Sequence, residues 1–104
     1  MSDELIEIFV IEGRELIDQA HAALAALGGG DADGAALDEL FRAFHTLKGS
    51  AGLMGFSAMS AVFHAGEDLL GEARTSGARP GGALAAALIA VLDQTEVWLD
   101  MAAA

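Results

Sequence analysis

Large apolar side chains recur at three- and four-residue steps along the chain, and this spacing predicts amphipathic helices. Glycine-rich breaks separate the apolar segments from one another. The pattern predicts four helices, over residues 3–27, 35–54, 57–76 and 80–102. No segment alternates apolar and polar residues as a half-buried strand does, so we expect an all-α protein.

Each predicted helix has one apolar stripe, which we take as the face that it buries. The stripe of the first helix consists of Leu5, Ile8, Phe9, Leu16, Ala20, Ala23 and Leu27. That of the second helix consists of Leu37, Leu40, Phe44, Leu47 and Ala51. The stripe of the third helix consists of Met59, Val62, Phe63, Gly66, Leu69, Leu70 and Ala73. That of the fourth helix consists of Leu84, Leu88, Val91, Thr95, Trp98 and Ala102. Beside the stripe of the first helix stand four more apolar residues, which either widen the buried face or form a docking strip: Ile6, Val10, Ile17 and Leu24.

The connections between the helices are short, so neighbouring helices run antiparallel and the chain forms an up-down-up-down four-helix bundle. Its 104 residues suffice for one domain, so residues 1–104 form a single unit. Alanine and glycine fill many positions between the large side chains, which predicts closely packed helices and no cavity for a buried cofactor. The last residues, Met101 to Ala104, give no stop signal, so we expect the N-terminal part of a longer chain.

Acidic residues outnumber basic ones, with 16 Asp and Glu against 5 Lys and Arg and a net charge of −11. This charge repels phosphate backbones and anionic lipid headgroups, so nucleic acids and membrane surfaces are poor partners. The longest apolar run, Ala83 to Leu92, is shorter than the roughly 20 residues needed to cross a bilayer. We expect no membrane insertion and, because signal sequence and cysteine are both absent, a cytoplasmic protein.

Histidine has an ordinary pKa near neutrality, so the three histidines are the first candidates for chemistry. A helical wheel places His45 roughly 130° from the apolar stripe of the second helix, so its side chain faces outward. Lys48 lies one turn later on the same side and provides a nearby cation. His21 lies away from the stripe of the first helix, and we expect an ordinary surface residue there.

Gly49 and Gly52 lie on the same face of the second helix as His45. A glycine inside a helix costs about 1 kcal/mol relative to alanine, and this helix has two on one face. We interpret them as a bare surface that lets a partner come close. The alternative is that they let a neighbouring helix pack tightly.

The third helix carries His64 and Glu67, three residues apart and away from its apolar stripe, with Glu67 nearer the core. A carboxylate in this position can accept a hydrogen bond from an imidazole, and a plain surface ion pair is the alternative. A metal site in a bundle needs more converging ligands than His45, His64 and Glu67, so we expect no metal. The chain also has no Walker-type or dinucleotide-binding loop, so we expect neither an ATP site nor a cofactor in this domain.

Residues 41–56, above all His45-Thr46-Leu47-Lys48-Gly49-Ser50-Ala51, resemble the signature of histidine phosphotransfer (HPt) domains. The likeness is greatest to the N-terminal phosphotransfer domain of CheA-type chemotaxis histidine kinases, and it continues through residues 64–74. In that family the histidine that matches His45 is phosphorylated on its outer ring nitrogen by a separate ATP-binding domain. It then passes the phosphoryl group to an Asp of a response regulator. Lys48, His64 and Glu67 match the supporting polar network, in which the glutamate accepts a hydrogen bond from the other ring nitrogen.

The resemblance implies the phosphoacceptor and carrier part of a phosphotransferase in a two-component phosphorelay, rather than a complete enzyme. The expected partners are a receiver domain of a response regulator and the ATP-binding domain of a histidine kinase. Gly49 and Gly52 are the expected docking positions for the regulator. The alternative from another class is an acidic helical module that binds a partner without chemistry.

Overall fold

The computed structural model describes residues 3–28, 34–76 and 82–104. These residues form four helices, α1 (Asp3–Gly28), α2 (Ala35–Leu53), α3 (Ser57–Ser76) and α4 (Gly82–Ala103), and no strand. The helix bounds expected from the sequence differ from the observed ones by at most two residues. The expected start of the last helix, residue 80, lies outside the described residues.

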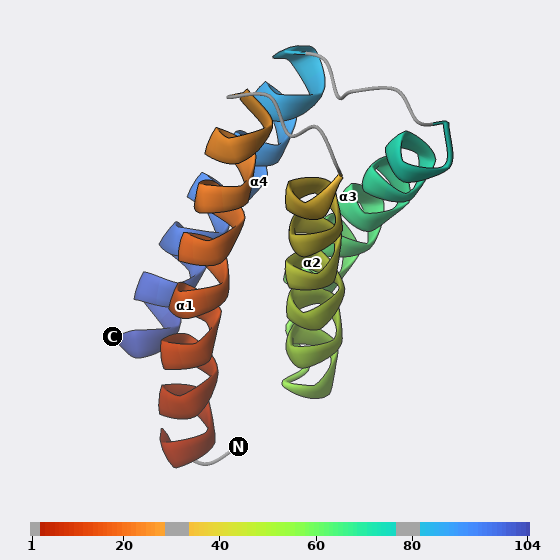
Figure 1. The fold of residues 1–104 in the computed structure, drawn as a ribbon. Coiled ribbons are helices and arrows are strands. Elements are labelled where there is room, and N and C mark those ends of the chain that lie inside the picture. The colour runs from red at the N-terminus through yellow and green to blue at the C-terminus, as the bar shows by residue number, and fades with distance from the viewer. Residues whose placement is uncertain (1–2, 29–33, 77–81) are drawn as a thin grey trace.

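The four helices form an antiparallel bundle with extents of 43 × 21 × 20 Å (Figure 1). α1 packs against α2 on one side and against α4 on the other, and α2 packs against α3. α3 touches α4 little, and its C-terminal end leans away from α4 in Figure 1. The predicted all-α, up-down-up-down four-helix bundle is confirmed.

All four helices contribute large, almost fully buried side chains to one core: Ile17, Leu40, Phe44, Leu47, Phe63, Leu70, Leu88, Leu92 and Leu99. The stripe predicted for α2 is buried in full. In α3, Leu69 is 45% exposed although it was assigned to the stripe. In α4, Leu88 and Thr95 are buried as predicted. At the alternate positions Leu92 and Leu99 are buried, whereas the predicted Val91 and Trp98 are half-buried, so half of that stripe is one residue off.

The stripe predicted for α1 is partly wrong. Leu5 and Ile8 are 53% and 52% exposed, whereas Val10 and Ile17 are only 4% and 1% exposed. α1 packs against both α2 and α4, and the centre of its buried face lies near small residues such as Gly13, which a wheel weighted by large side chains misses. Val10 and Ile17 therefore belong to the core and cannot form a docking strip.

Two glycines let the helices come close together. A Cβ atom added at Gly66 of α3 would lie 2.5 Å from Cε2 of Phe44, and one added at Gly13 of α1 would lie 3.2 Å from Cδ1 of Leu99. The ring of Phe44 also packs edge-on against Phe63, with ring centroids 5.1 Å apart and planes at 84°. The close helix packing predicted from the small residues is thus observed at these two contacts.

A short turn over residues 54–56 connects α2 to α3. Gly55 has a φ of 80°, in the left-handed region that favours glycine. The backbone N–H groups of Gly55 and Phe56 donate to the carbonyls of Gly52 and Ala51, at 3.1 and 2.9 Å. This tight turn sets α3 beside α2 in the opposite direction, so the C-terminal half of α2 faces the N-terminal and middle parts of α3.

α4 is 22 residues long and contains an 18-residue stretch with a mean hydropathy of 1.4, so its length and composition would allow it to cross a membrane. The apolar run Ala83–Leu92 forms the first half of this helix, which was predicted to extend to residue 102 and ends at Ala103. Core helices of bundles meet the same criteria, and this helix buries Leu88, Leu92, Thr95 and Leu99 against the bundle. α4 is therefore a bundle helix in this structure.

Candidate functional site

His45 lies in the middle of α2, and its side chain is 64% exposed. Its Nδ1 atom lies 2.8 Å from Oε2 of Glu67, a residue of α3 that is 14% exposed. The residues just before these two, Phe44 and Gly66, pack against each other. The close contact between the two helices thus brings an exposed imidazole onto a half-buried carboxylate.

Lys48 binds the other oxygen of the same carboxylate, with Nζ 3.0 Å from Oε1 of Glu67. Its side chain is 23% exposed, because it lies between α2 and α3. The hydroxyl of Ser60 donates to the Lys48 backbone carbonyl at 3.1 Å and ties this part of α2 to α3. Both oxygens of Glu67 therefore have a positive or proton-donating partner.

The two partners decide the ionisation of Glu67. Burial raises the pKa of its carboxyl group, but hydrogen bonds and the charges of Lys48 and His45 lower it by more. The pKa of Glu67 therefore lies below the ordinary value for glutamate, and the group is an anion at neutral pH.

An ionised carboxylate can only accept hydrogen bonds, so Nδ1 of His45 must be the donor in its bond to Glu67. In the neutral imidazole the second nitrogen, Nε2, then holds the free lone pair. No described residue forms a hydrogen bond or ion pair with Nε2. The arrangement presents a nucleophilic ring nitrogen on the outer surface of the bundle.

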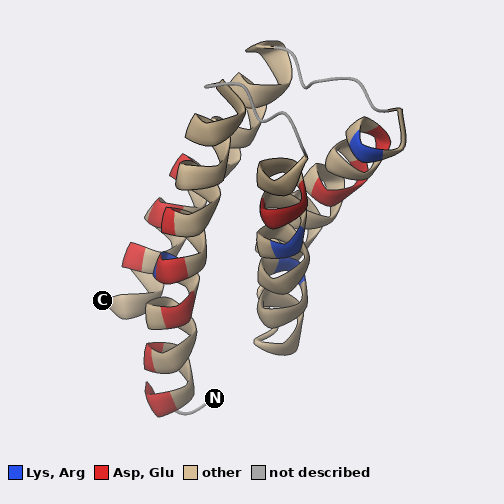
Figure 2. Ribbon diagram, viewed as in Figure 1, with Lys and Arg blue, Asp and Glu red and all other residues tan. Residues whose placement is uncertain are grey.

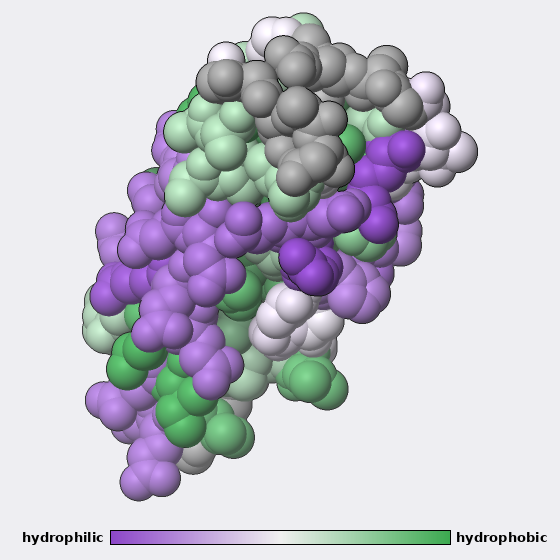
Figure 3. All heavy atoms as spheres, viewed as in Figure 1, coloured by the Kyte–Doolittle hydropathy of each residue, from purple (hydrophilic) through white to green (hydrophobic). Residues whose placement is uncertain are grey.

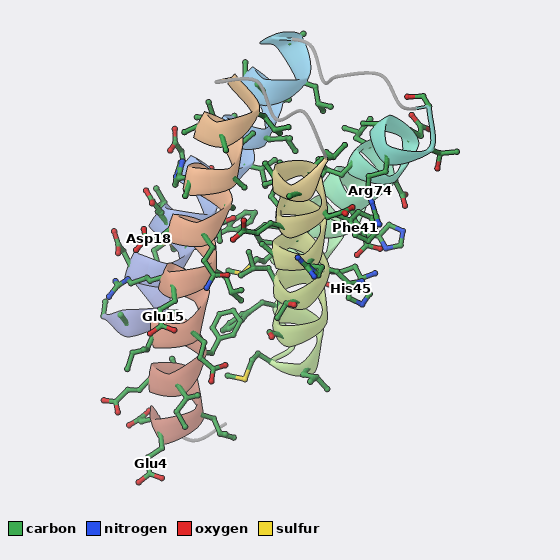
Figure 4. All side chains as sticks on the ribbon, viewed as in Figure 1. Glu4, Glu15, Asp18, Phe41, His45 and Arg74 are labelled. Carbon is green, nitrogen blue, oxygen red and sulfur yellow. The ribbon has the colours of Figure 1, made fainter. Side chains whose placement is uncertain are left out.

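Phe41 lies beside His45, and Arg74 and Asp38 are linked to it through Phe41; none of the three was predicted as a site residue. The ring of Phe41 lies nearly parallel to the imidazole, with centroids 6.5 Å apart and planes at 9°. The guanidinium carbon of Arg74 lies 4.4 Å from the centroid of the Phe41 ring, and Nε of Arg74 lies 2.8 Å from Oδ1 of Asp38. Figure 4 shows Arg74, Phe41 and His45 following one another at the edge between α2 and α3. The four-residue spacing of Phe41 and His45 was the one sequence signal for this group.

The other two histidines lie apart from this site. His64 is 62% exposed, and its Nε2 atom lies 3.5 Å from Oδ2 of Asp68, four residues later. Glu67 thus binds His45 rather than His64, and no described contact joins His64 to His45. The supporting role implied for His64 stays a prediction. His21 is only half-buried rather than fully solvated, with Nε2 3.8 Å from Oε1 of Glu96.

Gly49 and Gly52 are exposed on α2, and the space around them differs. A Cβ atom added at Gly49 would meet nothing within 4 Å, and one added at Gly52 would lie 3.4 Å from the hydroxyl of Ser60. Neither glycine is therefore needed for close helix packing, a role that Gly66 and Gly13 have instead. The bare surface expected beside His45 is present.

Charge is unevenly distributed over the bundle. Figure 2 shows acidic residues in a row along α1, while α2 and α3 carry both acidic and basic residues. Arg14, Lys48 and Arg74 each pair with a carboxylate. Arg42, one turn before His45, is the one Lys or Arg in the described part of the chain without such a partner. The same part of the chain holds no group of three or more His, Cys, Asp or Glu suited to a metal ion.

Apolar side chains also reach the surface near the lower end of the bundle as drawn. Figure 3 shows hydrophobic atoms over the N-terminal half of α1. Leu5, Ile8 and Ile11 of α1 are 52–58% exposed, and Leu53 at the end of α2 is 91% exposed. These residues, and not Val10 or Ile17, are the exposed large apolar side chains of α1 and α2 at this end.

The sequence matches the Hpt domain family over residues 4–98. The chemotaxis protein CheA of Halobacterium salinarum is 46% identical over 72 residues, and that of Treponema pallidum is 31% identical over 99 residues. The matches cover 69% and 95% of this chain but 11% and 12% of the relatives. The chain thus spans about a tenth of the length of these curated relatives.

Solved structures share the fold. The CheA phosphotransferase domain from Thermotoga maritima is 33% identical, with a TM-score of 0.94 and coverage of 100% of this chain and 99% of that one. The phosphorylated P1 domain of CheA3, solved in complex with CheY6 from R. sphaeroides, is 31% identical, with a TM-score of 0.89 and coverage of 98% and 80%. A computationally redesigned four-helix bundle, 24% identical, has a TM-score of 0.88 and shows likeness of fold alone.

Proposed function

Because this chain belongs to the Hpt domain family, we propose that His45 is its phosphoacceptor and carries a phosphoryl group between two protein partners. The observation that supports this most is the 2.8 Å hydrogen bond from Nδ1 of His45 to Glu67. This bond leaves the lone pair on Nε2, in a side chain that is 64% exposed. A nucleophile so placed can be reached by one partner and then by another.

In the first step the Nε2 lone pair attacks the γ-phosphorus of ATP held by a separate histidine-kinase domain. The N–P bond forms while the P–O bond to ADP breaks, and ADP leaves with the electron pair. Nδ1 keeps its proton, so the imidazole ring becomes a cation, and the Glu67 carboxylate 2.8 Å away stabilises that charge. The domain itself supplies the acceptor, and the nucleotide stays with the kinase domain.

In the second step a carboxylate oxygen of an Asp in a receiver domain attacks the phosphorus. The N–P bond breaks, and its electron pair returns to Nε2 of His45. Lys48 holds Glu67 in place through its 3.0 Å bond, and its ammonium has further N–H donors for the phosphoryl oxygens. The relative from R. sphaeroides, solved in phosphorylated form with CheY6, supports a receiver domain as the second partner. A cytoplasmic location accords with both partners.

A transfer assay tests this function. The domain is mixed with the ATP-binding domain of a CheA-type kinase and ATP labelled at the γ-phosphate, and the acid-labile phosphate on the domain is counted. We expect label on the wild type and on His21→Gln, and none on His45→Gln. Binding of the kinase domain without labelling of the wild type would favour the acidic interaction module instead, and acid-labile phosphate on His45→Gln would exclude His45 as the sole acceptor.

A further inference from the structure

A single hydrogen bond does not fix the orientation of an imidazole ring. The last torsion of histidine has a broad, roughly two-fold energy profile, so rotamer preference leaves the ring plane loosely defined. Glu67 anchors Nδ1 of His45, but one bond to one ring atom still lets the two side-chain torsions vary together and turn the ring. With 64% of the side chain exposed, core packing does not restrict this rotation. Another neighbour must therefore set the direction of Nε2.

Phe41 is placed to provide this second restraint. It lies one turn before His45 on α2, and its ring plane is within 9° of the imidazole plane. The centroid separation of 6.5 Å falls in the range of offset-stacked aromatic pairs. A ring stacked in this way resists rotation of the imidazole out of the common plane.

Phe41 is itself held from α3. The guanidinium of Arg74 lies over its ring at 4.4 Å, and the 2.8 Å ion pair with Asp38 fixes the guanidinium. A Cβ atom at Gly71 would lie 3.7 Å from Cε2 of Phe41, so the ring is seated against a residue without a side chain. Asp38, Phe41 and Arg74 thus form a clamp that crosses from α2 to α3 and ends at the imidazole.

We propose that Phe41, held by Arg74 and Asp38, is a positioning residue that fixes the plane of the His45 imidazole and so directs Nε2 outward for phosphoryl transfer. The proposal rests on the proposed function of His45. It differs from the role of Glu67, which selects the nitrogen that carries the proton. The clamp selects the direction in which the free nitrogen points.

Phosphorylation by the kinase domain, measured over a range of concentrations of the phosphotransfer domain, provides the first test. Phe41→Leu keeps an apolar side chain against Gly71 but removes the stacked ring, and we expect kcat to fall by about two- to tenfold with KM unchanged. Phe41→Tyr keeps the ring and should retain the wild-type rate. Equal rates for Phe41→Leu and the wild type, both below their melting temperatures, would overturn the proposal.

Arg74→Ala tests the clamp while leaving both rings in place, and Arg14→Ala is a matched control. Arg14 also forms a 2.8 Å ion pair with an aspartate, Asp100, but lies between α1 and α4, away from His45. In nuclear magnetic resonance spectra we expect the ring-current shift of the His45 ring protons to decrease in Arg74→Ala and to stay unchanged in Arg14→Ala. Identical His45 spectra in the two variants would overturn the role of Arg74.

These outcomes are distinguishable from a failure of the proposed function. A wild-type domain that takes up no label would exclude phosphoryl transfer by His45. A labelled wild type with unaffected Phe41→Leu and Arg74→Ala variants would exclude the clamp alone. The resonance measurement needs no kinase, so it reports on the clamp in either case.

Discussion

The ring of Phe44 occupies the space that a side chain at Gly66 would need, since a Cβ atom there would lie 2.5 Å from Cε2 of the ring. Phe44 is fully buried and packed against Phe63, so it cannot move aside without disturbing the core. Because Phe44 precedes His45 and Gly66 precedes Glu67, this contact also sets the separation of the two functional side chains.

We therefore expect Gly66→Ala to lower the free energy of unfolding by about 1–3 kcal/mol, the usual cost of overpacking a core. The phosphorylation rate should fall as well, because α2 and α3 must move apart. Gly49→Ala is the control, since a Cβ atom there meets nothing within 4 Å. It should raise the free energy of unfolding by up to about 1 kcal/mol through helix propensity. Chemical denaturation of both variants checks that the two changes in unfolding free energy have opposite signs. Equal stabilities would contradict the packing role of Gly66.

Glu67→Gln should slow phosphorylation of His45 by about ten- to a hundredfold, the effect typical of losing a carboxylate that orients and polarises an imidazole. The amide can still accept a hydrogen bond from Nδ1, but it lacks the charge that stabilises the ring cation. Labelling rates at temperatures where both proteins are folded provide the measurement. An unchanged rate would show that the 2.8 Å bond has no part in the chemistry.

The ion pairs of Glu67 should also make stability depend on pH. Its pKa is lower in the folded protein than in the unfolded chain, so the unfolded chain binds the proton first as the pH falls. The contribution of Glu67 is therefore complete above about pH 4.3, the ordinary pKa of glutamate, and is lost as the pH falls through the folded-state pKa. We expect the difference in unfolding free energy between wild type and Glu67→Gln to shrink from pH 6 towards low pH. Carboxylates that titrate alike in the two proteins contribute nothing to this difference, so it reports on Glu67. A difference that stays constant with pH would contradict the linkage.

Gly49→Gln should leave the bundle stable and obstruct the receiver domain. The site is open, so the added side chain projects into solvent on the face that carries His45. We expect transfer from the phosphorylated domain to a receiver to slow by about tenfold, as a loss of 1.4 kcal/mol in binding free energy would give. Labelling by the kinase domain in the same preparation shows whether the obstruction is specific to the receiver. A normal transfer rate would remove Gly49 from the docking surface.

Arg42 is free to meet an acidic partner, because it is exposed and, within the described residues, has no carboxylate partner. Arg42→Ala should slow association with a receiver domain by about threefold at low salt, and the effect should vanish near 1 M salt, where the Debye length is about 3 Å. Arg14→Ala changes the net charge by the same amount on the far side of α1 and serves as the control. Equal association rates for the two variants would show that only total charge matters.

The sequence was sufficient for the α2 stripe and the outward direction of His45 because large apolar residues mark the buried face of that helix. It was insufficient for α1, where Gly13 lies at the centre of the contact with α4. Small residues leave little hydrophobic signal, although they are the places where helices approach each other.

The pairing of Glu67 with His45 and Lys48 was expected through the resemblance to a family. Glu67 lies 22 residues from His45 and 19 from Lys48, so no local spacing predicts these contacts. The clamp of Asp38, Phe41 and Arg74 was missed for the same reason. Arg74 reaches Phe41 only because α3 reverses direction at Gly55 and returns along α2.

The exposure of His45 has a consequence for how much signal the domain can deliver. A phosphoryl group on a side chain that is 64% open to solvent is accessible to water, so water competes with the receiver for the phosphorus. The outcome is a race between hydrolysis, which has a fixed rate, and encounter with a receiver, which depends on its concentration. The fraction of phosphoryl groups that arrives then rises with the abundance of the receiver as well as with the rate at which the bundle binds it.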